Sequence, residues 1–345
     1  MSHVTVSLAL RGRCEIPLAT QKKIKAIAKR LGYSPDPMLG ALSAYRRIQR
    51  PSAFHSNLAW IISDPLPETF YRGDFLLYFE GARERARELG YGLERVHLAD
   101  HHYERRAVQR MLAARGIKGL LICPVPDPSG HVDLDWARYS AVRFGYSMRD
   151  TILHTVTNSQ YRTCFFAVEQ LVRRGYRRVG YITEAGFNSR TGGHFLGGYL
   201  SAKAHFAMKE IPVLVQEWPK SGEGYASRWE TTRLWIEKEK PDAIITDGRD
   251  ILNQLKRWGL RVPEDIGFAS VSVQEKGDIV SGMHQNPRRV GSAAVDLLVS
   301  LLERQETGIP KTPMHLLIEG EWRDGQTTAP LAKKSRRSAR LPKGI

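Results

Sequence analysis

Short apolar segments alternate with longer amphipathic segments from about residue 57 to the C-terminal region. The clearest apolar runs are 58–63, 178–183, 243–247 and 267–273. Between such runs, apolar residues recur at the three- and four-residue spacing of a helix. A continuous apolar run is typical of a strand buried on both faces, as in a parallel sheet covered by helices. About nine or ten such strands exceed what one doubly wound sheet usually carries, so the pattern predicts two parallel α/β lobes with a cleft between them.

The first fifty residues follow a different, helical pattern. Leu18, Ile24 and Leu31 fall on one face of a segment whose other face is rich in lysine, and Gly32 follows as a helix stop. The segment 38–50 can restart as a short helix after the sequence SPDP, which breaks the chain. This region is therefore expected to be a small helical module joined to the larger α/β body.

Residues 2–10 allow two interpretations. Val4 and Val6 alternate with polar residues, as in a strand, whereas Ser2 could cap a short helix that stops at Gly12. In either case we expect the larger apolar side chains of the module to form its core, namely Val6, Leu10, Ile24 and Ile27.

The net charge of +16 is concentrated at the two ends of the chain. Residues 1–50 carry ten Lys and Arg against two acids, and residues 331–345 carry six Lys and Arg and no acid. The 280 residues between them carry 36 basic and 34 acidic side chains and are nearly neutral. Clustered basic residues beside a helical segment are typical of a surface that meets phosphate backbones. The basic tail is expected to be disordered; it could add nonspecific affinity for nucleic acid or simply increase solubility.

Common active-site motifs are absent from the sequence. It has no G-x-x-x-x-G-K-[S/T], H-E-x-x-H, G-x-S-x-G or C-x-x-C segment, so we expect no enzymatic activity. Cys14, Cys123 and Cys164 have no metal-ligand spacing and form no disulfide framework, and we expect no cofactor and no metal. No apolar run reaches the ~18–20 residues of a membrane-spanning helix, and the N-terminus lacks a secretory signal. These features predict a cytoplasmic protein that does not enter a membrane.

Four separated segments carry a more specific pattern. They are residues 2–7 (SHVTVS), 30–35 (RLGYSP), 87–91 (RELGY) and 259–266 (GLRVPEDI). Their order and spacing resemble those of the lactose-repressor (LacI/GalR) family of transcriptional regulators, and the resemblance extends to about residue 325.

The resemblance implies a particular organisation of the chain. A partial all-α helix-turn-helix head and a hinge helix would occupy residues 1–50. An effector-binding and dimerisation domain with two lobes, like a periplasmic binding protein, would occupy residues 51–330, and the basic tail 331–345 would follow.

The family's head begins with a helix upstream of the recognition helix, and Met1 stands here just before the segment that matches the recognition helix. The first helix of the head is therefore expected to be missing from this chain. Either the start codon was chosen too late or half of the motif was lost, and we favour the first explanation.

DNA-contacting residues follow from the resemblance, position by position. His3 and Val4 match positions that read base edges in the major groove. Small hydroxyl side chains suit phosphate oxygens, and Arg11 matches a base or backbone reader. The hydroxyl candidates are Thr5, Ser7 and Thr20.

The segment 37–44 matches the family's hinge helix, which relatives fold on DNA. Leu42 falls at the position of an apolar wedge that enters the minor groove and bends the duplex. The alternative is that Leu42 only packs within a pair of helices.

Effector contacts are implied more loosely. Phe195 stands where relatives often place an arginine, and other polar anchors of the family are altered near Ser272 and Arg249. Such a cleft could hold a less polar or anionic ligand, or none, although a carbohydrate remains the family's usual effector. The candidate lining residues are Asp64, Tyr71, Phe75, Asn188, Arg190, Thr191, Phe195, Asp247, Arg249 and Gln274.

Two functions remain open at this point. The first is a regulator, expected to be a repressor, that binds a double-stranded DNA operator as a homodimer and responds to a small-molecule effector. The alternative is a ligand-binding sensor without operative DNA binding.

Overall fold

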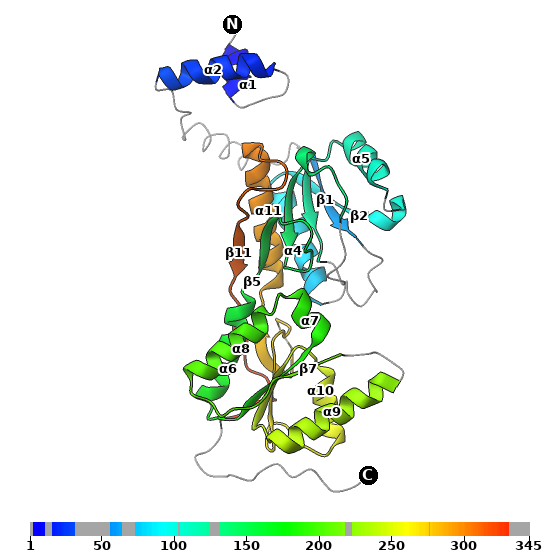
Figure 1. Cartoon of the computed structure of the whole chain (residues 1–345), viewed down its shortest axis with the longest axis vertical. Coiled ribbons are helices and arrows are strands. Elements are labelled where there is room, and N and C mark those ends of the chain that lie inside the picture. The colour runs from blue at the N-terminus through cyan, green and yellow to red at the C-terminus, as the bar shows by residue number, and fades with distance from the viewer. Residues whose placement is uncertain are drawn as a thin grey trace.

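The computed structural model describes residues 3–10, 16–31, 56–63, 73–102, 104–124, 132–217, 223–275 and 277–330. Within these residues the chain forms two six-stranded sheets, each covered by helices, and two further helices near the N-terminus (Figure 1). The α/β class with two parallel lobes, predicted from the alternating pattern, is confirmed.

The N-terminal pair consists of α1 (His3–Leu10) and α2 (Leu18–Arg30). Residues 3–10 therefore form a helix and not the alternative strand. Ala9 and Ile24 are buried between the helices, whereas Ile27 is exposed, so the prediction that Ile27 belongs to the core is wrong. A single partner helix covers only part of the apolar stripe of α2, which also leaves Leu18 and Leu31 exposed.

The sheet of the first lobe is parallel and has the order β11-β5-β4-β3-β1-β2. Its strands are β1 (Ser56–Ile62), β2 (Tyr91–His97), β3 (Gly119–Ile122), β4 (Ser140–Phe144), β5 (His154–Asn158) and β11 (His315–Ile318).

Both faces of this sheet are covered, which explains its apolar strands. On one face Leu58 and Trp60 of β1 pack with residues of α4 (Asp74–Glu88) and α11 (Pro287–Arg304). On the other face Ala59 and Ile61 pack with residues of α5 (Arg105–Ala114). Alternate residues of one strand thus enter two separate cores. Short 3-10 turns, η1 (Leu98–His101) and η2 (Trp136–Arg138), lie in the connections.

The second lobe repeats the architecture with the order β12-β10-β9-β8-β6-β7, in which only β12 is antiparallel to its neighbour. Its strands are β6 (Val179–Glu184), β7 (Leu214–Gln216), β8 (Ala243–Thr246), β9 (Gly267–Ser270), β10 (Ser281–His284) and β12 (Glu321–Arg323). Helices on one face are α6 (Gln160–Arg173), α7 (Ala185–Arg190) and α8 (His194–His205), and on the other α9 (Glu223–Glu239) and α10 (Asp250–Arg257).

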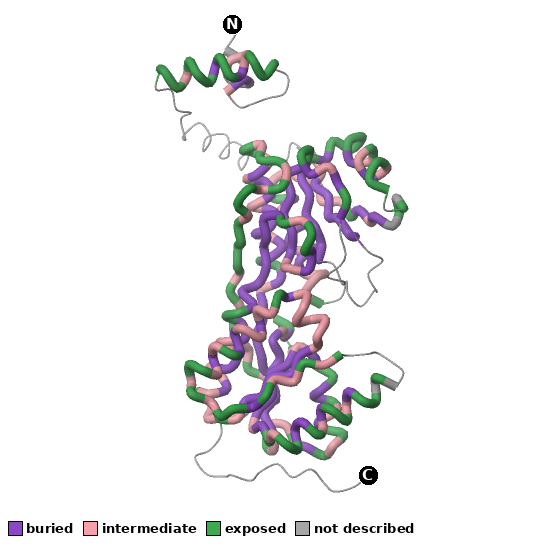
Figure 2. Tube along the Cα trace, viewed as in Figure 1, coloured by how far each residue is buried: buried purple, intermediate pink, exposed green. Residues whose placement is uncertain are grey.

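The chain passes between the lobes three times, after β5, after β10 and after β11. The crossings are bonded to one another: the Ser159 backbone N–H donates to the Ile318 carbonyl at 2.7 Å, and the Asn286 side-chain amide donates to the Glu319 carbonyl at 2.8 Å. Figure 2 shows buried chain running through this junction. The two lobes are therefore joined by a bonded three-segment hinge.

The described chain has twelve strands rather than nine or ten. The additional ones include β5 and β10, whose sequences HTVTN and SGMH contain polar residues that the lobe interior buries. Gly192 and Gly193 adopt positive φ angles of 62° and 72° and separate α7 from α8.

Two glycines allow α4 and α11 to cross in close contact. A Cβ atom at Gly291 would lie 1.9 Å from the Tyr78 carbonyl oxygen, and one at Gly81 would lie 2.1 Å from the Arg288 carbonyl oxygen. This crossing fixes α4, whose first turn lies at the junction of the lobes. Backbone atoms cannot yield as a flexible side chain would, so the close approach requires glycine at both positions.

We predict that Gly291→Ala lowers the free energy of unfolding by about 1–3 kcal/mol, because overpacking at the backbone of α4 outweighs the ~1 kcal/mol gain in helix propensity. Urea denaturation measures the difference. The control is Ser292→Ala on the same helix, where the side chain is half-buried. An unchanged or increased stability of Gly291→Ala would contradict the close-crossing interpretation.

Candidate functional site

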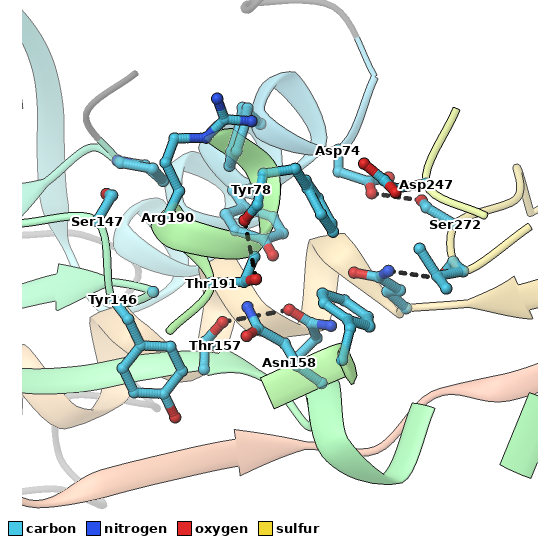
Figure 3. A pocket seen from close by; sticks show the side chains of 18 residues that line it. Asp74, Tyr78, Tyr146, Ser147, Thr157, Asn158, Arg190, Thr191, Asp247 and Ser272 are labelled. Atoms are coloured by element: carbon cyan, nitrogen blue, oxygen red, sulfur yellow. Dashed lines mark hydrogen bonds between the residues drawn. The ribbon is translucent and has the colours of Figure 1, made fainter. Parts of the chain in front are cut away.

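A cavity of about 310 Å³ lies between the two lobes, beside the hinge (Figure 3). About half of its lining comes from residues within three positions of the end of a strand, because the carboxyl ends of the strands in both sheets face it. It is lined by Asp74, Phe75, Tyr78, Pro124, Gly145, Tyr146, Ser147, Thr157, Asn158, Gln160, Phe187, Arg190, Thr191, Phe195, Asp247, Val271, Ser272 and Gln285.

The first lobe supplies an acidic and aromatic wall. Asp74, Phe75 and Tyr78 lie in the first five residues of α4, and the ring centroids of Phe75 and Tyr78 are 5.6 Å apart in an edge-to-face arrangement. Burial raises the pKa of the Tyr78 hydroxyl, and the nearby Asp74 carboxyl adds to this effect. Tyr78 is therefore a neutral hydrogen-bonding group in the cavity wall over the physiological pH range.

The second lobe supplies an aromatic wall with one cation. Gly192 and Gly193 turn the chain so that Phe187 of α7 and Phe195 of α8 lie 5.3 Å apart. Arg190 lines the cavity beside them and makes no ion pair with any residue that the structure describes. A guanidinium without a carboxylate partner can donate hydrogen bonds to a ligand.

The hinge supplies the floor of the cavity. Asn158 and Gln160 are 2% and 8% exposed, yet the Asn158 Nδ2 donor and the Gln160 Oε1 acceptor have no hydrogen-bond partner within the described chain. The Asn158 carbonyl group is occupied, because Thr157 donates to Oδ1 at 3.2 Å. A buried polar group without a partner costs about 1–3 kcal/mol. The floor therefore presents one donor and one acceptor that a bound ligand can satisfy.

Asp74 joins the lobes directly. The Ser272 hydroxyl, which follows β9 in the second lobe, donates to Asp74 Oδ2 at 2.6 Å (Figure 3). Burial raises the pKa of Asp74, and the hydrogen bond from Ser272 acts in the opposite direction. Displacement of either lobe would break this bond.

Two further contacts cross the cleft. The ring of Tyr146, after β4, lies 4.3 Å from the ring of His194 in α8. Arg149 donates from Nη2 to the Ser189 hydroxyl at 2.9 Å. Together with the bond from Ser272 to Asp74, these contacts hold the lobes closed around the cavity.

Asp247 follows β8 and carries the most unusual electrostatics of the site. Burial raises its pKa to about 7, although a hydrogen bond from Thr183 and the backbone N–H of Glu184 favour the charged form. Its Oδ1 atom has no partner within the described chain. Near neutral pH this carboxyl can thus either donate or accept a hydrogen bond.

Comparison with known proteins places this geometry in context. The model of the periplasmic binding protein-like domain matches residues 168–328. The repressor PurR of Proteus mirabilis (strain HI4320) is 22% identical over 342 residues, covering 91% of each chain. The repressor CytR of Escherichia coli (strain K12) is 24% identical over 336 residues, covering 94% of this chain and 93% of CytR.

Solved structures agree in fold. A complex of the transcriptional regulator CelR with cellobiose superposes with a TM-score of 0.61 at 20% identity, covering 95% of this chain and 96% of CelR. The lac repressor dimer bound to operator and an anti-inducer gives a TM-score of 0.56 at 18% identity with the same coverage. The chain is thus similar in sequence to the PurR and CytR repressors over most of its length, and it shares the fold of LacI-type regulators.

Five of the ten effector candidates line the cavity, namely Phe75, Arg190, Thr191, Phe195 and Asp247. Asn188, Arg249 and Gln274 are outside the lining: Arg249 pairs with Asp278, and the backbone N–H of Gln274 donates to the same carboxylate. Asp64 and Tyr71 lie outside the described residues. The binding roles of all ten stay predictions.

Sequence reasoning missed much of the lining, including Asp74, Tyr146, Asn158 and Gln285. A usable signal existed for Tyr146 and Gln285, because they stand two residues beyond β4 and one residue beyond β10. Asn158 is the last residue of β5, and neither β5 nor β10 was recognised from the sequence.

Five of the seven candidate DNA-contacting residues lie in the N-terminal helix pair. His3, Val4, Thr5 and Ser7 belong to α1, and Thr20 is half-buried in the first turn of α2. Arg11 and Leu42 lie outside the described residues, and all seven stay predictions. None of the described helices combines the length and apolar character that crossing a bilayer requires.

We predict that Asp247→Asn flattens the pH dependence of stability. A pKa raised from 3.8 to about 7 means that the folded state keeps a proton that the unfolded state releases. Wild-type stability should therefore fall as pH rises from 4 to 7, by up to about 4 kcal/mol from this group, and then level off.

Denaturant unfolding at several pH values measures this effect, with Asp150→Asn, at an exposed carboxyl, as the control. Parallel pH profiles for wild type and Asp247→Asn would show that Asp247 ionises normally.

Proposed function

We propose that this protein is a sequence-specific transcriptional repressor whose affinity for DNA is set by a small-molecule effector bound between its lobes. The observation that carries the proposal is the cavity itself, which both lobes and the hinge enclose and which holds buried polar atoms without partners. A ligand that satisfies atoms from both lobes binds the closed arrangement preferentially and so shifts the equilibrium between lobe positions.

A carbohydrate is the effector class that we propose. Its hydroxyl groups can pair with the Asn158 amide, the Gln160 carbonyl and the Asp247 carboxyl. Its apolar ring faces can lie against the rings of Phe75 and Phe195. This combination of apolar walls and a few oriented polar groups is usual for small-molecule sites. CelR was solved with cellobiose, and a LacI-family regulator from Enterococcus faecium with ribose, which gives the class a precedent on this fold.

The DNA-binding end of the proposal rests on the helix pair. We propose that α1 is the recognition helix, with His3 and Val4 at base edges. Lys22 and Lys23 are exposed on α2 and would meet phosphates. Thr5, Ser7, Thr20 and Arg11 would fix the register, and Leu42 would enter the minor groove.

A homodimer on an approximately palindromic operator follows from this arrangement, because two half-sites require two heads. Such a regulator acts in the cytoplasm, where its DNA is. A protein that binds effector but shows only weak, sequence-independent binding to DNA would instead be a ligand sensor.

We predict different consequences for base-reading and phosphate-contacting residues. After selection of preferred sites from a random duplex library, His3→Ala should change the base preference at one position by about 1–3 kcal/mol. Lys22→Ala should weaken binding to all sequences and lower the salt slope by about 0.9. Fluorescence anisotropy at several salt concentrations separates the two, and equal effects on all sequences from both substitutions would contradict the assigned roles.

We predict that one or more sugars in a thermal-shift panel raise the melting temperature, and that Asn158→Ala abolishes most of that shift. Loss of one buried hydrogen bond to the ligand should weaken binding by about 10-fold, as measured by calorimetry. Asn253→Ala, on α10 and outside the cavity lining, is the control. A shift that persists unchanged in Asn158→Ala would place the ligand elsewhere.

A further inference from the structure

Helix α5 carries three arginines and no acid in the sequence RRAVQRMLAA. Two of them, Arg105 and Arg106, stand in its first turn, where the positive end of the helix dipole disfavours cations. The apolar residues Val108 and Leu112 anchor the opposite face in the core. The helix dipole therefore does not favour Arg105 and Arg106 at these positions, and the arginines of this exposed face call for another explanation.

One face of α5 forms a surface hollow of about 240 Å³ together with η2. It is lined by Arg106, Gln109, Arg110, Ala113 and Arg138, which we call the arginine hollow. The Gln109 Nε2 atom is buried there and has no hydrogen-bond partner within the described chain. Three guanidinium groups and an amide donor around one depression match the requirements of an anion.

Neighbouring arginines on this lobe are neutralised, which sets the hollow apart. Arg105 pairs with Asp133 at 3.3 Å, and Arg115 pairs with Glu94 at 2.7 Å. Arg138 pairs with Asp135 through Nε, at 2.8 Å, so its two terminal nitrogens take no part in that ion pair. Arg106 and Arg110 have no ion pair with any described residue, and both are exposed.

The arginine hollow lies at the end of the first lobe where β1 begins, which is the end that follows the N-terminal helices in the chain. β1 begins at Ser56, whose hydroxyl donates to the Gly116 carbonyl just after α5 at 3.3 Å. Arg138 comes two residues before β4 begins, at the same end of the sheet. Figure 1 shows α5 at the end of the body that is nearer α1 and α2.

We propose that the arginine hollow binds phosphate groups, and that their source is the DNA backbone beside the segment contacted by α1. Guanidinium groups form paired hydrogen bonds with phosphate oxygens, and counterions released from DNA add to the affinity. This assignment of the source rests on the proposed DNA-binding function. A free phosphate anion has the same chemistry and is the second source that the experiment separates.

The experiment uses the full chain with the double substitution Arg106→Gln, Arg110→Gln. The matched control is Arg83→Gln, Arg87→Gln, which removes two exposed arginines at the same spacing from α4 of the same lobe. Anisotropy measures affinity for a 40-base-pair duplex between 50 and 200 mM salt. In a second arm, 10 mM inorganic phosphate is compared with chloride at equal ionic strength for its effect on the melting temperature.

The hollow variant cannot neutralise two of the DNA phosphates, so the magnitude of its salt slope should be smaller by about 1.8. Between 50 and 200 mM salt, the affinity of the wild type for the duplex should therefore fall by a factor about 12 times larger than that of the variant. The control should keep the wild-type slope. The alternative result has two parts: the salt slope of the hollow variant equals that of the wild type, and phosphate raises the melting temperature of the wild type and the control but not of the hollow variant. That result supports the free anion as the source.

Equal changes in both variants, or no change in either arm, would overturn the phosphate site. A wild type that does not bind the duplex at all refutes the proposed function separately, and the phosphate arm then still decides whether the hollow binds phosphate.

Discussion

Everything at the candidate site depends on the triple passage of the chain between two parallel sheets. Because the three crossings are bonded to one another, as in the 2.7 Å bond from Ser159 to Ile318, the sheets cannot separate fully. They keep the carboxyl ends of their strands turned toward one cavity. Loops at that edge take no part in the hydrogen bonds between strands, so their sequences can include polar side chains without disturbing the sheet. The site is a consequence of topology before it is a consequence of particular residues.

Several residues at the cavity lower the stability of the fold, because they bury polar groups whose hydrogen bonds only a ligand can complete. Asp247 is held where its charged form is disfavoured, and Asn158 and Gln160 bury polar atoms without partners in the described chain. The rigid contacts are elsewhere, in the glycine crossing of α4 with α11 and in the four apolar cores. The cleft is closed by a few polar contacts, each of which involves an exposed or titratable group. An effector therefore competes with weak interactions rather than with a core.

The sequence could predict the lobes because β1, β8 and β9 are apolar on both faces. It could not predict β5, because Thr155 and Thr157 are buried through hydrogen bonds that pattern reasoning does not register. At the site, Phe195 and Asp247 were found from their positions after strands or by resemblance. Arg249 stands two residues beyond Asp247, yet Asp278, from a distant loop, draws its guanidinium into an ion pair. Contacts between side chains of different loops are set by tertiary structure, which is why sequence reasoning located strands better than it located ligand-facing atoms.

The distribution of charge along the chain bears on how the body can contribute to DNA binding. A nearly neutral middle section gives the body no general attraction for DNA, so any contribution from it must be local. The arginine hollow meets that condition, since Arg106 and Arg110 are unpaired within the described chain while Arg105, Arg115 and Arg138 are matched by carboxylates. The hollow and the start of β1, which follows the head in the chain, lie at the same end of the first lobe. A phosphate contact there would therefore add a second point of attachment to DNA beside the contacts of α1.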